Sequence, residues 1–107
     1  MYLNSALELR LRELWIGVIE VLTAPNGGNT RALTNVIAWA DSKQEFGRSA
    51  SGMLEGYGWT VVGTANVRPV SQESNYREEI AAIIERARSI PEACIFGTLH
   101  YYPSRPA

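Results

Sequence analysis

His100 is the only histidine in this 107-residue chain, and Tyr101 and Tyr102 follow it directly. An imidazole beside a phenol near the end of a strand could act as a general base in a pocket. The structural alternative is a partly buried histidine bonded to the backbone, with tyrosines that anchor the strand and keep their hydroxyl groups in water. The structural interpretation is preferred, but these three residues are the first candidates for ligand binding.

Cys94 is the only cysteine, and it lies on the same predicted strand as His100. At about 3.3 Å per residue the two side chains are roughly 20 Å apart, too far for a Cys–His nucleophilic pair. Strict alternation along the strand places Cys94, Phe96 and His100 on one face. We interpret Cys94 as a small buried side chain, and a single cysteine excludes a disulfide within the chain.

Two further side chains are candidates for ligand binding. Arg68, beside Pro69 at the end of a predicted strand, could bind an anion, although a solvated arginine is the simpler interpretation. Trp39 could line a hydrophobic cleft, although a tryptophan that fills the core is preferred. The sequence has no HExxH, CxxC, GxSxG or DxD motif, so it predicts no metal site, no cofactor and no familiar catalytic centre.

The composition is that of an ordinary globular protein, with 46% hydrophobic and 20% charged residues. Ten basic and eleven acidic residues leave a net charge of −1, which gives no electrostatic footprint for nucleic acid or for a membrane surface. Apolar runs are far shorter than the roughly 20 residues of a membrane span, and the first residues lack a signal-peptide layout. We expect a single domain over 1–107, cytoplasmic, without nucleic-acid or membrane partners.

The residue patterns predict six regular elements. Ser42 and Glu45 form a capping box before an apolar stripe of helical period, and Asn75 with Glu78 resembles a second box. Residues 2–14 fit either a helix or a strand, and a short helix is preferred. In chain order, the predicted elements are strands at 14–23 and 32–40, a helix at 42–56, a strand at 59–70, a helix at 75–88 and a strand at 93–102.

This order predicts an α+β two-layer sandwich in which a four-stranded mixed sheet carries two helices. The glycine-rich segment 24–31 is expected to join the first two strands as an antiparallel hairpin. The helix at 42–56 should connect its flanking strands as a parallel pair with a right-handed crossover. The element count resembles that of ferredoxin-like plaits, although the chain order differs from βαββαβ.

The strands are apolar on both faces, which is unusual for a two-layer sandwich with one wet sheet face. In the first strand, Ile16, Val18 and Leu22 share one face, and Ile19 and Val21 belong to the other. Three arrangements could cover the second sheet face: the N-terminal segment folds over it, the two helices lie on opposite faces, or a second chain docks there. An uncovered apolar patch of several hundred Å² is unusual on a monomer, so self-association is favoured.

The preferred hypothesis for function is a small non-enzymatic module that self-associates through its sheet and binds a protein partner or a small ligand. The alternative is a small cofactor-independent enzyme. Its pocket would lie between sheet and helices or at a subunit interface, and would use His100 with the nearby tyrosines.

Overall fold

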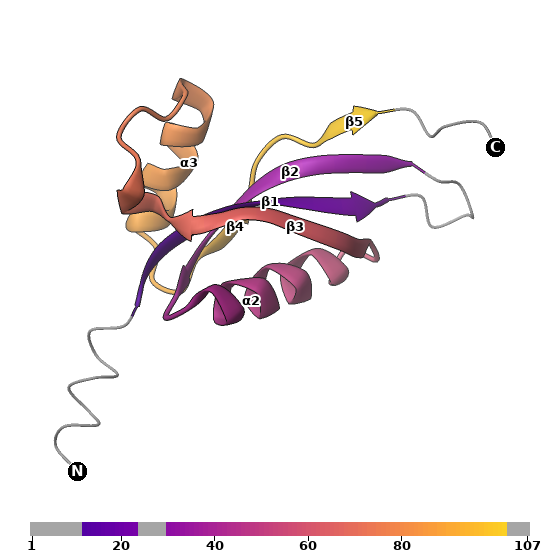
Figure 1. The fold of residues 1–107 in the computed structure, drawn as a ribbon, viewed down its shortest axis with the longest axis horizontal. Coiled ribbons are helices and arrows are strands. Elements are labelled where there is room, and N and C mark those ends of the chain that lie inside the picture. Colours follow the sequence, from indigo (N-terminus) through magenta and orange to yellow (C-terminus); the bar gives the residue numbers. More distant parts are fainter. Residues whose placement is uncertain (1–11, 24–29, 103–107) are drawn as a thin grey trace, which may run out of the picture.

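The computed structural model describes residues 12–23 and 30–102, which form an antiparallel sheet with an α-helix on each face (Figure 1). The elements in chain order are β1 Glu13–Leu22, β2 Arg31–Ala40, α2 Lys43–Glu55, β3 Thr60–Pro69, the 3₁₀-helix η1 Val70–Gln72, α3 Glu78–Arg88, β4 Cys94–Phe96 and β5 His100–Tyr102. The predicted α+β class is therefore confirmed. The short helix predicted at 2–14 falls almost wholly outside the described residues, and its last two positions belong to β1.

The sheet is antiparallel throughout, in the order β3-β1-β2-β4, and β5 pairs with β2 beyond β4. β1 and β2 form the expected hairpin and pair along their full length, from Glu13 opposite Ala40 to Leu22 opposite Arg31. β3 pairs with the other edge of β1, so β1 lies between the two strands that α2 connects. The predicted parallel pairing of β2 with β3, and with it the mixed sheet, is therefore wrong, because β1 lies between these two strands.

The predicted last strand is divided into β4 and β5, so the sheet has five strands instead of four. The interruption falls at Gly97, whose amide donates to the Asn35 carbonyl at 2.9 Å. A side chain at Gly97 would lie 2.8 Å from Cδ1 of Ile83, so α3 packs directly against this point of the backbone. A larger residue here would displace the end of the Ile83 side chain, and the break ends the alternation of the strand.

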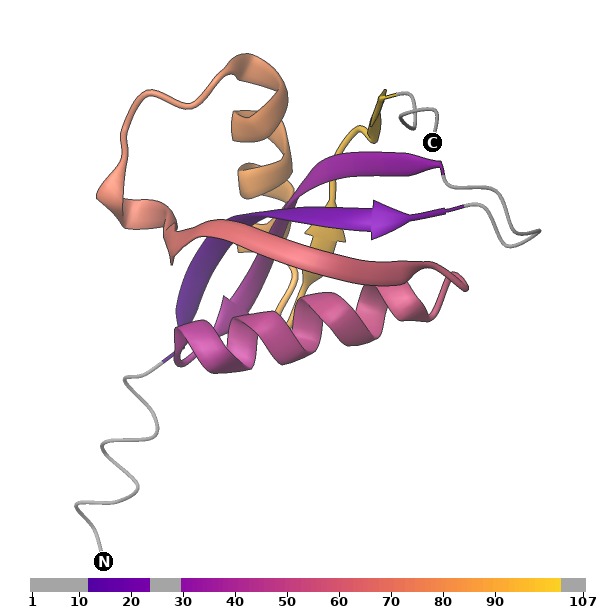
Figure 2. The same ribbon diagram turned by 45° about the vertical axis from the view of Figure 1, so that its right-hand side comes forward.

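The two helices cover opposite faces of the sheet, as Figures 1 and 2 show. Phe46, Ala50 and Leu54 of α2 pack on Ile19 and Val21 of β1 and on the small side chains of β2. On the other face, Leu14, Ile16 and Ile37 are covered by Ile80, Ile83, Ile84 and Ala87 of α3. The expected two-layer sandwich is thus corrected, because each face of β1 has its own helix.

The start of α2 matches the sequence prediction and the start of α3 does not. Ser42 Oγ accepts the Glu45 amide at 3.1 Å, while the Glu45 carboxylate accepts the amide of Asp41, one residue before the cap. α3 begins at Glu78 after Arg77, without a side-chain cap. The expected box at Asn75 does not form, because the helix begins only after Arg77, whose backbone is extended.

Close packing of β1 against α2 makes Gly17 a sensitive position. A Cβ at Gly17 would lie 2.9 Å from both Phe46 Cε2 and Val67 Cγ2. We expect Gly17→Ala to lower the free energy of unfolding by about 1–3 kcal/mol, measured by urea titration. The matched control is Gly47→Ala in α2, where nothing lies within 4 Å; it should raise the free energy of unfolding by about 0.5–1 kcal/mol. Equal effects of the two substitutions would contradict this packing.

Candidate functional site

The structure places His100 and Tyr101 on opposite sides of the sheet, whereas Tyr102 occupies a register position on the same side as His100. His100 is exposed and pairs with Leu33, which lies on the α3 side of the sheet. Tyr101, 57% exposed, pairs with Ala32 and so belongs to the α2 side. Tyr102 pairs with Arg31 in the ladder. His100 lines none of the three hollows described below in residues 12–23 and 30–102.

The break at Gly97 also separates His100 from Cys94. Cys94 and Phe96 pair with Ala38 and Val36 and pack on the α2 side, whereas His100 belongs to the α3 side. The predicted common face is therefore wrong, since Gly97 to Leu99 interrupt the alternation.

Arg68 and Trp39 have structural partners. Arg68 donates to Glu73 Oε1 at 2.7 Å and to the Asn66 carbonyl at 2.6 Å, which ties the end of β3 to the residue that follows η1. The Trp39 indole N–H donates to the carbonyls of Ala87 and Ile90 at the end of α3, at 3.0 and 3.1 Å. Both contacts favour the structural interpretations of these two side chains.

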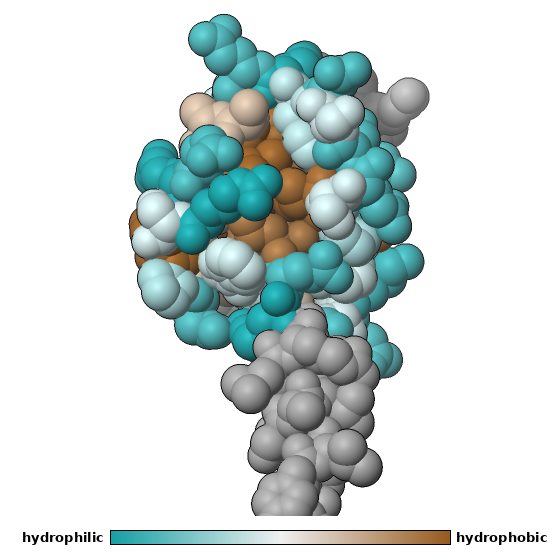
Figure 3. Space-filling view, turned by 90° about the vertical axis from the view of Figure 1, so that its left-hand side faces the viewer, coloured by the Kyte–Doolittle hydropathy of each residue, from teal (hydrophilic) through white to brown (hydrophobic). Residues whose placement is uncertain are grey.

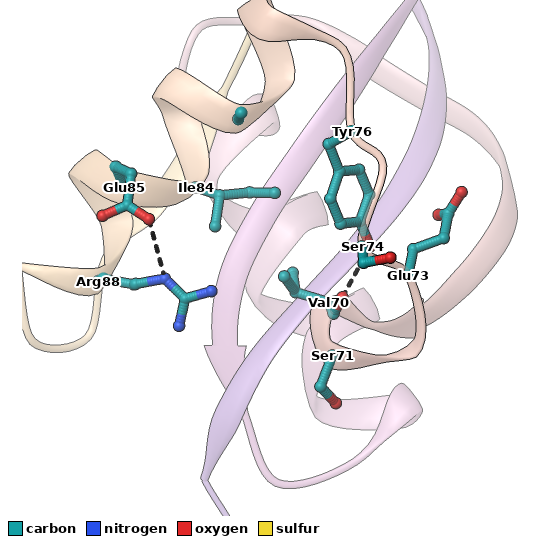
Figure 4. A pocket seen from close by; sticks show the side chains of 9 residues that line it. Val70, Ser71, Glu73, Ser74, Tyr76, Ile84, Glu85 and Arg88 are labelled. Carbon is teal, nitrogen blue, oxygen red and sulfur yellow. Dashed lines mark hydrogen bonds and ion pairs between the residues drawn. The ribbon is translucent and has the colours of Figure 1, made fainter.

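A groove of about 230 Å³ lies between η1 and α3. Ile84 points from α3 toward Val70 and Tyr76, and the rim carries Glu85 and Arg88, paired at 3.3 Å (Figure 4). The space-filling view of this end shows an apolar floor framed by polar side chains (Figure 3). A second hollow of about 180 Å³ continues the groove toward Arg12, Leu14 and Trp39. Sequence reasoning identified only Trp39 of these residues as a candidate.

The phenol of Tyr76, which lines the groove, is already engaged in a hydrogen bond. The Tyr76 hydroxyl donates to the Val70 carbonyl at 2.9 Å. Burial, and then the nearby Glu73 carboxylate, raise the pKa of Tyr76 above its usual value. A phenol that stays protonated and already donates its proton is a poor general base.

Arg12 connects three segments beside this groove. Its guanidinium binds both carboxylate oxygens of Glu45 at 3.0–3.1 Å, Glu92 at 2.6 Å and the Trp39 carbonyl at 3.2 Å. The backbone amide of Asp41, and then Arg12, lower the pKa of the Glu45 carboxyl. The start of β1, the start of α2 and the turn before β4 are thereby held together.

The second candidate is the part of the sheet that α3 leaves uncovered. We define the open half-face as Val18, Glu20, Leu22, Arg31 and Leu33, which share the α3 side of β1 and β2. Leu33 is 38% exposed, and Val18 and Leu22 are partly exposed. A shallow hollow of about 130 Å³ lies over this surface. The grouping of Val18 and Leu22 on one face follows from the sequence, but their exposure depends on where α3 ends.

An ion pair lies within the open half-face. Glu20 Oε2 accepts from Arg31 Nη1 at 2.7 Å, with 26% of the Glu20 side chain and 45% of the Arg31 side chain exposed. Glu20 lies opposite Leu33 on one side and Gly63 on the other. A Cβ at Gly63 would be 3.9 Å from the Glu20 carboxylate, so the glycine leaves room over β3.

Comparisons of the chain with protein-family models, curated proteins and solved structures found no match. Within residues 12–23 and 30–102, no cluster of histidine, cysteine and acidic side chains could hold a metal ion. Among the same residues, no helix has the length and apolarity needed to cross a membrane. The geometry of the groove and of the open half-face therefore carries the functional argument.

The Arg12–Glu45 contact should make stability depend on pH. Because the folded-state pKa of Glu45 lies below its usual 4.5, its ionised form stabilises the fold above that pH and loses this effect as the pH falls. We expect Glu45→Gln to lower the free energy of unfolding by about 0.5–1 kcal/mol at pH 7, with the difference from the unsubstituted chain shrinking as the pH falls below 4.5. Urea titrations at several pH values measure this. Glu55→Gln, at the exposed other end of α2, is the control, and a difference for Glu45→Gln that does not shrink as the pH falls would contradict the expectation.

Cys94 should react slowly in the folded protein. Burial raises the pKa of its thiol from 9.0 to about 11, and its Sγ lies 3.7 Å from the Ser49 carbonyl. At pH 8 the thiolate is then about 100-fold scarcer than in the unfolded chain, and only the thiolate alkylates. Iodoacetamide labelling should therefore be about 100-fold slower without urea than with it. Equal rates would show that Cys94 is accessible and ionised.

Proposed function

We propose that this protein is a small cytoplasmic, non-enzymatic module that self-associates through its open half-face and binds a protein or small-molecule partner in the groove between η1 and α3. The observation that carries the proposal is the apolar surface of Val18, Leu22 and Leu33, which continues a sheet face that α3 buries at its other end. Exposed apolar surface of this kind favours association.

The edge of the sheet is a less suitable route to association than its face. β3 is an edge strand, but its pairing with β1 shifts register between Ile16 and Val18 and again between Glu20 and Val21. Asn66 on β3 has a positive φ of 55°. Bulges of this kind twist an edge away from a flat ladder and oppose pairing with another strand. The proposal therefore places the second copy on the face.

The size of the surface predicts weak association. The open half-face adjoins a stretch of β3 whose Gly63, Thr64 and Ala65 line the same hollow, so the surface spans three strands. With strands about 4.8 Å apart and five residues of about 3.3 Å on each, its footprint is roughly 240 Å² per copy. Burying roughly 480 Å² in total is worth at most about 12 kcal/mol at 25 cal/mol per Å². The loss of translational and rotational freedom opposes this by about 4–15 kcal/mol. The balance favours a dimer that forms in the micromolar range or above.

A charge at Leu33 should abolish association. Leu33 is already 38% exposed, so Leu33→Glu leaves the fold intact but places an unpaired carboxylate in the proposed interface. We expect the mass of the unsubstituted protein, measured by light scattering from about 10 µM to 1 mM, to rise toward that of a dimer. The Leu33→Glu variant should remain monomeric over the same range.

The matched control is Ile90→Glu, because Ile90 is 46% exposed and lies in the turn after α3, away from the open half-face. It should associate like the unsubstituted protein. A monomer at every concentration for the unsubstituted protein would refute the proposed self-association.

A further inference from the structure

The groove between η1 and α3 and the hollow beside Trp39 form one continuous depression, because Val70, Ser71 and Arg88 line both parts. With about 230 and 180 Å³, each part is smaller than the roughly 300–1,000 Å³ of a typical small-molecule site. The floor is apolar and the rim is polar (Figure 3). Two small apolar hollows in a row suit successive side chains of a polypeptide segment better than one compact ligand.

The described part of the chain begins at the edge of this depression. Arg12, Glu13 and Leu14 line its second part, so residues 1–11 join the fold there. A helix of 11 residues is about 16 Å long. Val18, at the near edge of the open half-face, lies six residues along β1 from Arg12, or about 20 Å. A helix at 1–11 therefore reaches the groove and falls short of the open half-face.

The sequence of residues 1–11 and the ends of the neighbouring strands favour a helix in this segment. An apolar stripe of helical spacing is formed by Leu3, Leu7 and Leu11. A strand that continued β1 would find no neighbour among the described strands, because β2 ends opposite Glu13 and β3 ends opposite Trp15. A helix shorter than about 12–15 residues is marginal in water, so this one needs an apolar surface for its stripe.

We propose that residues 1–11 fold as an amphipathic helix that lies in this groove of the same chain, with Leu7 over Val70 and Ile84. This inference rests on the proposed role of the groove as a binding site and adds its regulation. In the free protein the segment occupies the groove, and a partner must displace it. The partner that competes for the same floor is itself a short helix with a stripe of apolar side chains.

Disulfide formation between introduced cysteines locates the segment in the whole chain. Two cysteines can be bridged only where their Cα atoms come within about 7 Å. In a Cys94→Ala background, we expect Leu7→Cys/Ser71→Cys to form an intramolecular disulfide about tenfold or more faster than two control pairs. The protein is oxidised with glutathione disulfide at submicromolar concentration. Thiol labelling measures the rate, and a non-reducing gel separates links within a chain from links between chains.

The two control pairs have a reach similar to that of the test pair. Lys43→Cys lies at the exposed start of α2, the helix that Arg12 also contacts, but α2 covers the other face of the sheet. Leu9 lies about 200° from Leu7 around a helix, although the two would share one face of a strand. Leu7→Cys/Lys43→Cys and Leu9→Cys/Ser71→Cys should therefore both link slowly. Urea unfolding midpoints show that each variant is folded.

Each other outcome overturns the inference. Equal rates for Ser71→Cys and Lys43→Cys would show that the segment does not lie in the groove, and equal rates for Leu7→Cys and Leu9→Cys would exclude the helix. A link that forms only between chains would assign the groove to the segment of a second copy.

The failure of this inference is distinguishable from that of the proposed function. The disulfide is formed within single chains, so its rate does not depend on self-association. A slow link in a protein whose mass still rises with concentration overturns this inference alone. A monomer at every concentration overturns the proposed self-association, and a fast link at Ser71 would then still stand.

Discussion

The central position of β1 is the constraint on which the other elements depend. β1 pairs with β2 along one edge and with β3 along the other, so its backbone groups are satisfied inside the sheet. Its side chains are apolar on both sides, with Ile16 fully buried on one face and Ile19 on the other. A strand of this kind needs cover on both faces. The opposite placement of α2 and α3 follows from that need.

The unequal cover of the two faces follows from length. α3 has 11 residues, or about 16 Å of helix, whereas the ten-residue strands extend about 33 Å. Even a helix laid along β1 would therefore cover about half of this face. The Trp39 indole, bound to the carbonyls of Ala87 and Ile90, fixes the end of α3 over the first half. The open half-face is what remains.

Patterns among neighbouring residues predicted the local structure, but they could not predict which strands pair across the sheet. The Ser42 cap, the apolar stripe of α2 and the alternation of β1 all follow from neighbouring residues. The insertion of β1 between β2 and β3 does not, because no residue pattern states which strands pair. The break at Gly97 was missed for a similar reason: it lies against Ile83 of α3, a neighbour that is distant in the sequence. That one break changed the face assigned to His100.

For the candidate sites, too, the sequence predicted local properties but not the contacts between distant residues. The sequence indicated that both sheet faces are apolar, which is the property from which the open half-face arises, but it directed attention to single reactive side chains. The ion pair of Glu20 and Arg31 joins adjacent strands, so its position within the patch depends on the hairpin register. The pair joins the two strands at 2.7 Å between apolar neighbours, so the half of the face that α3 leaves uncovered is apolar with one charge of each sign.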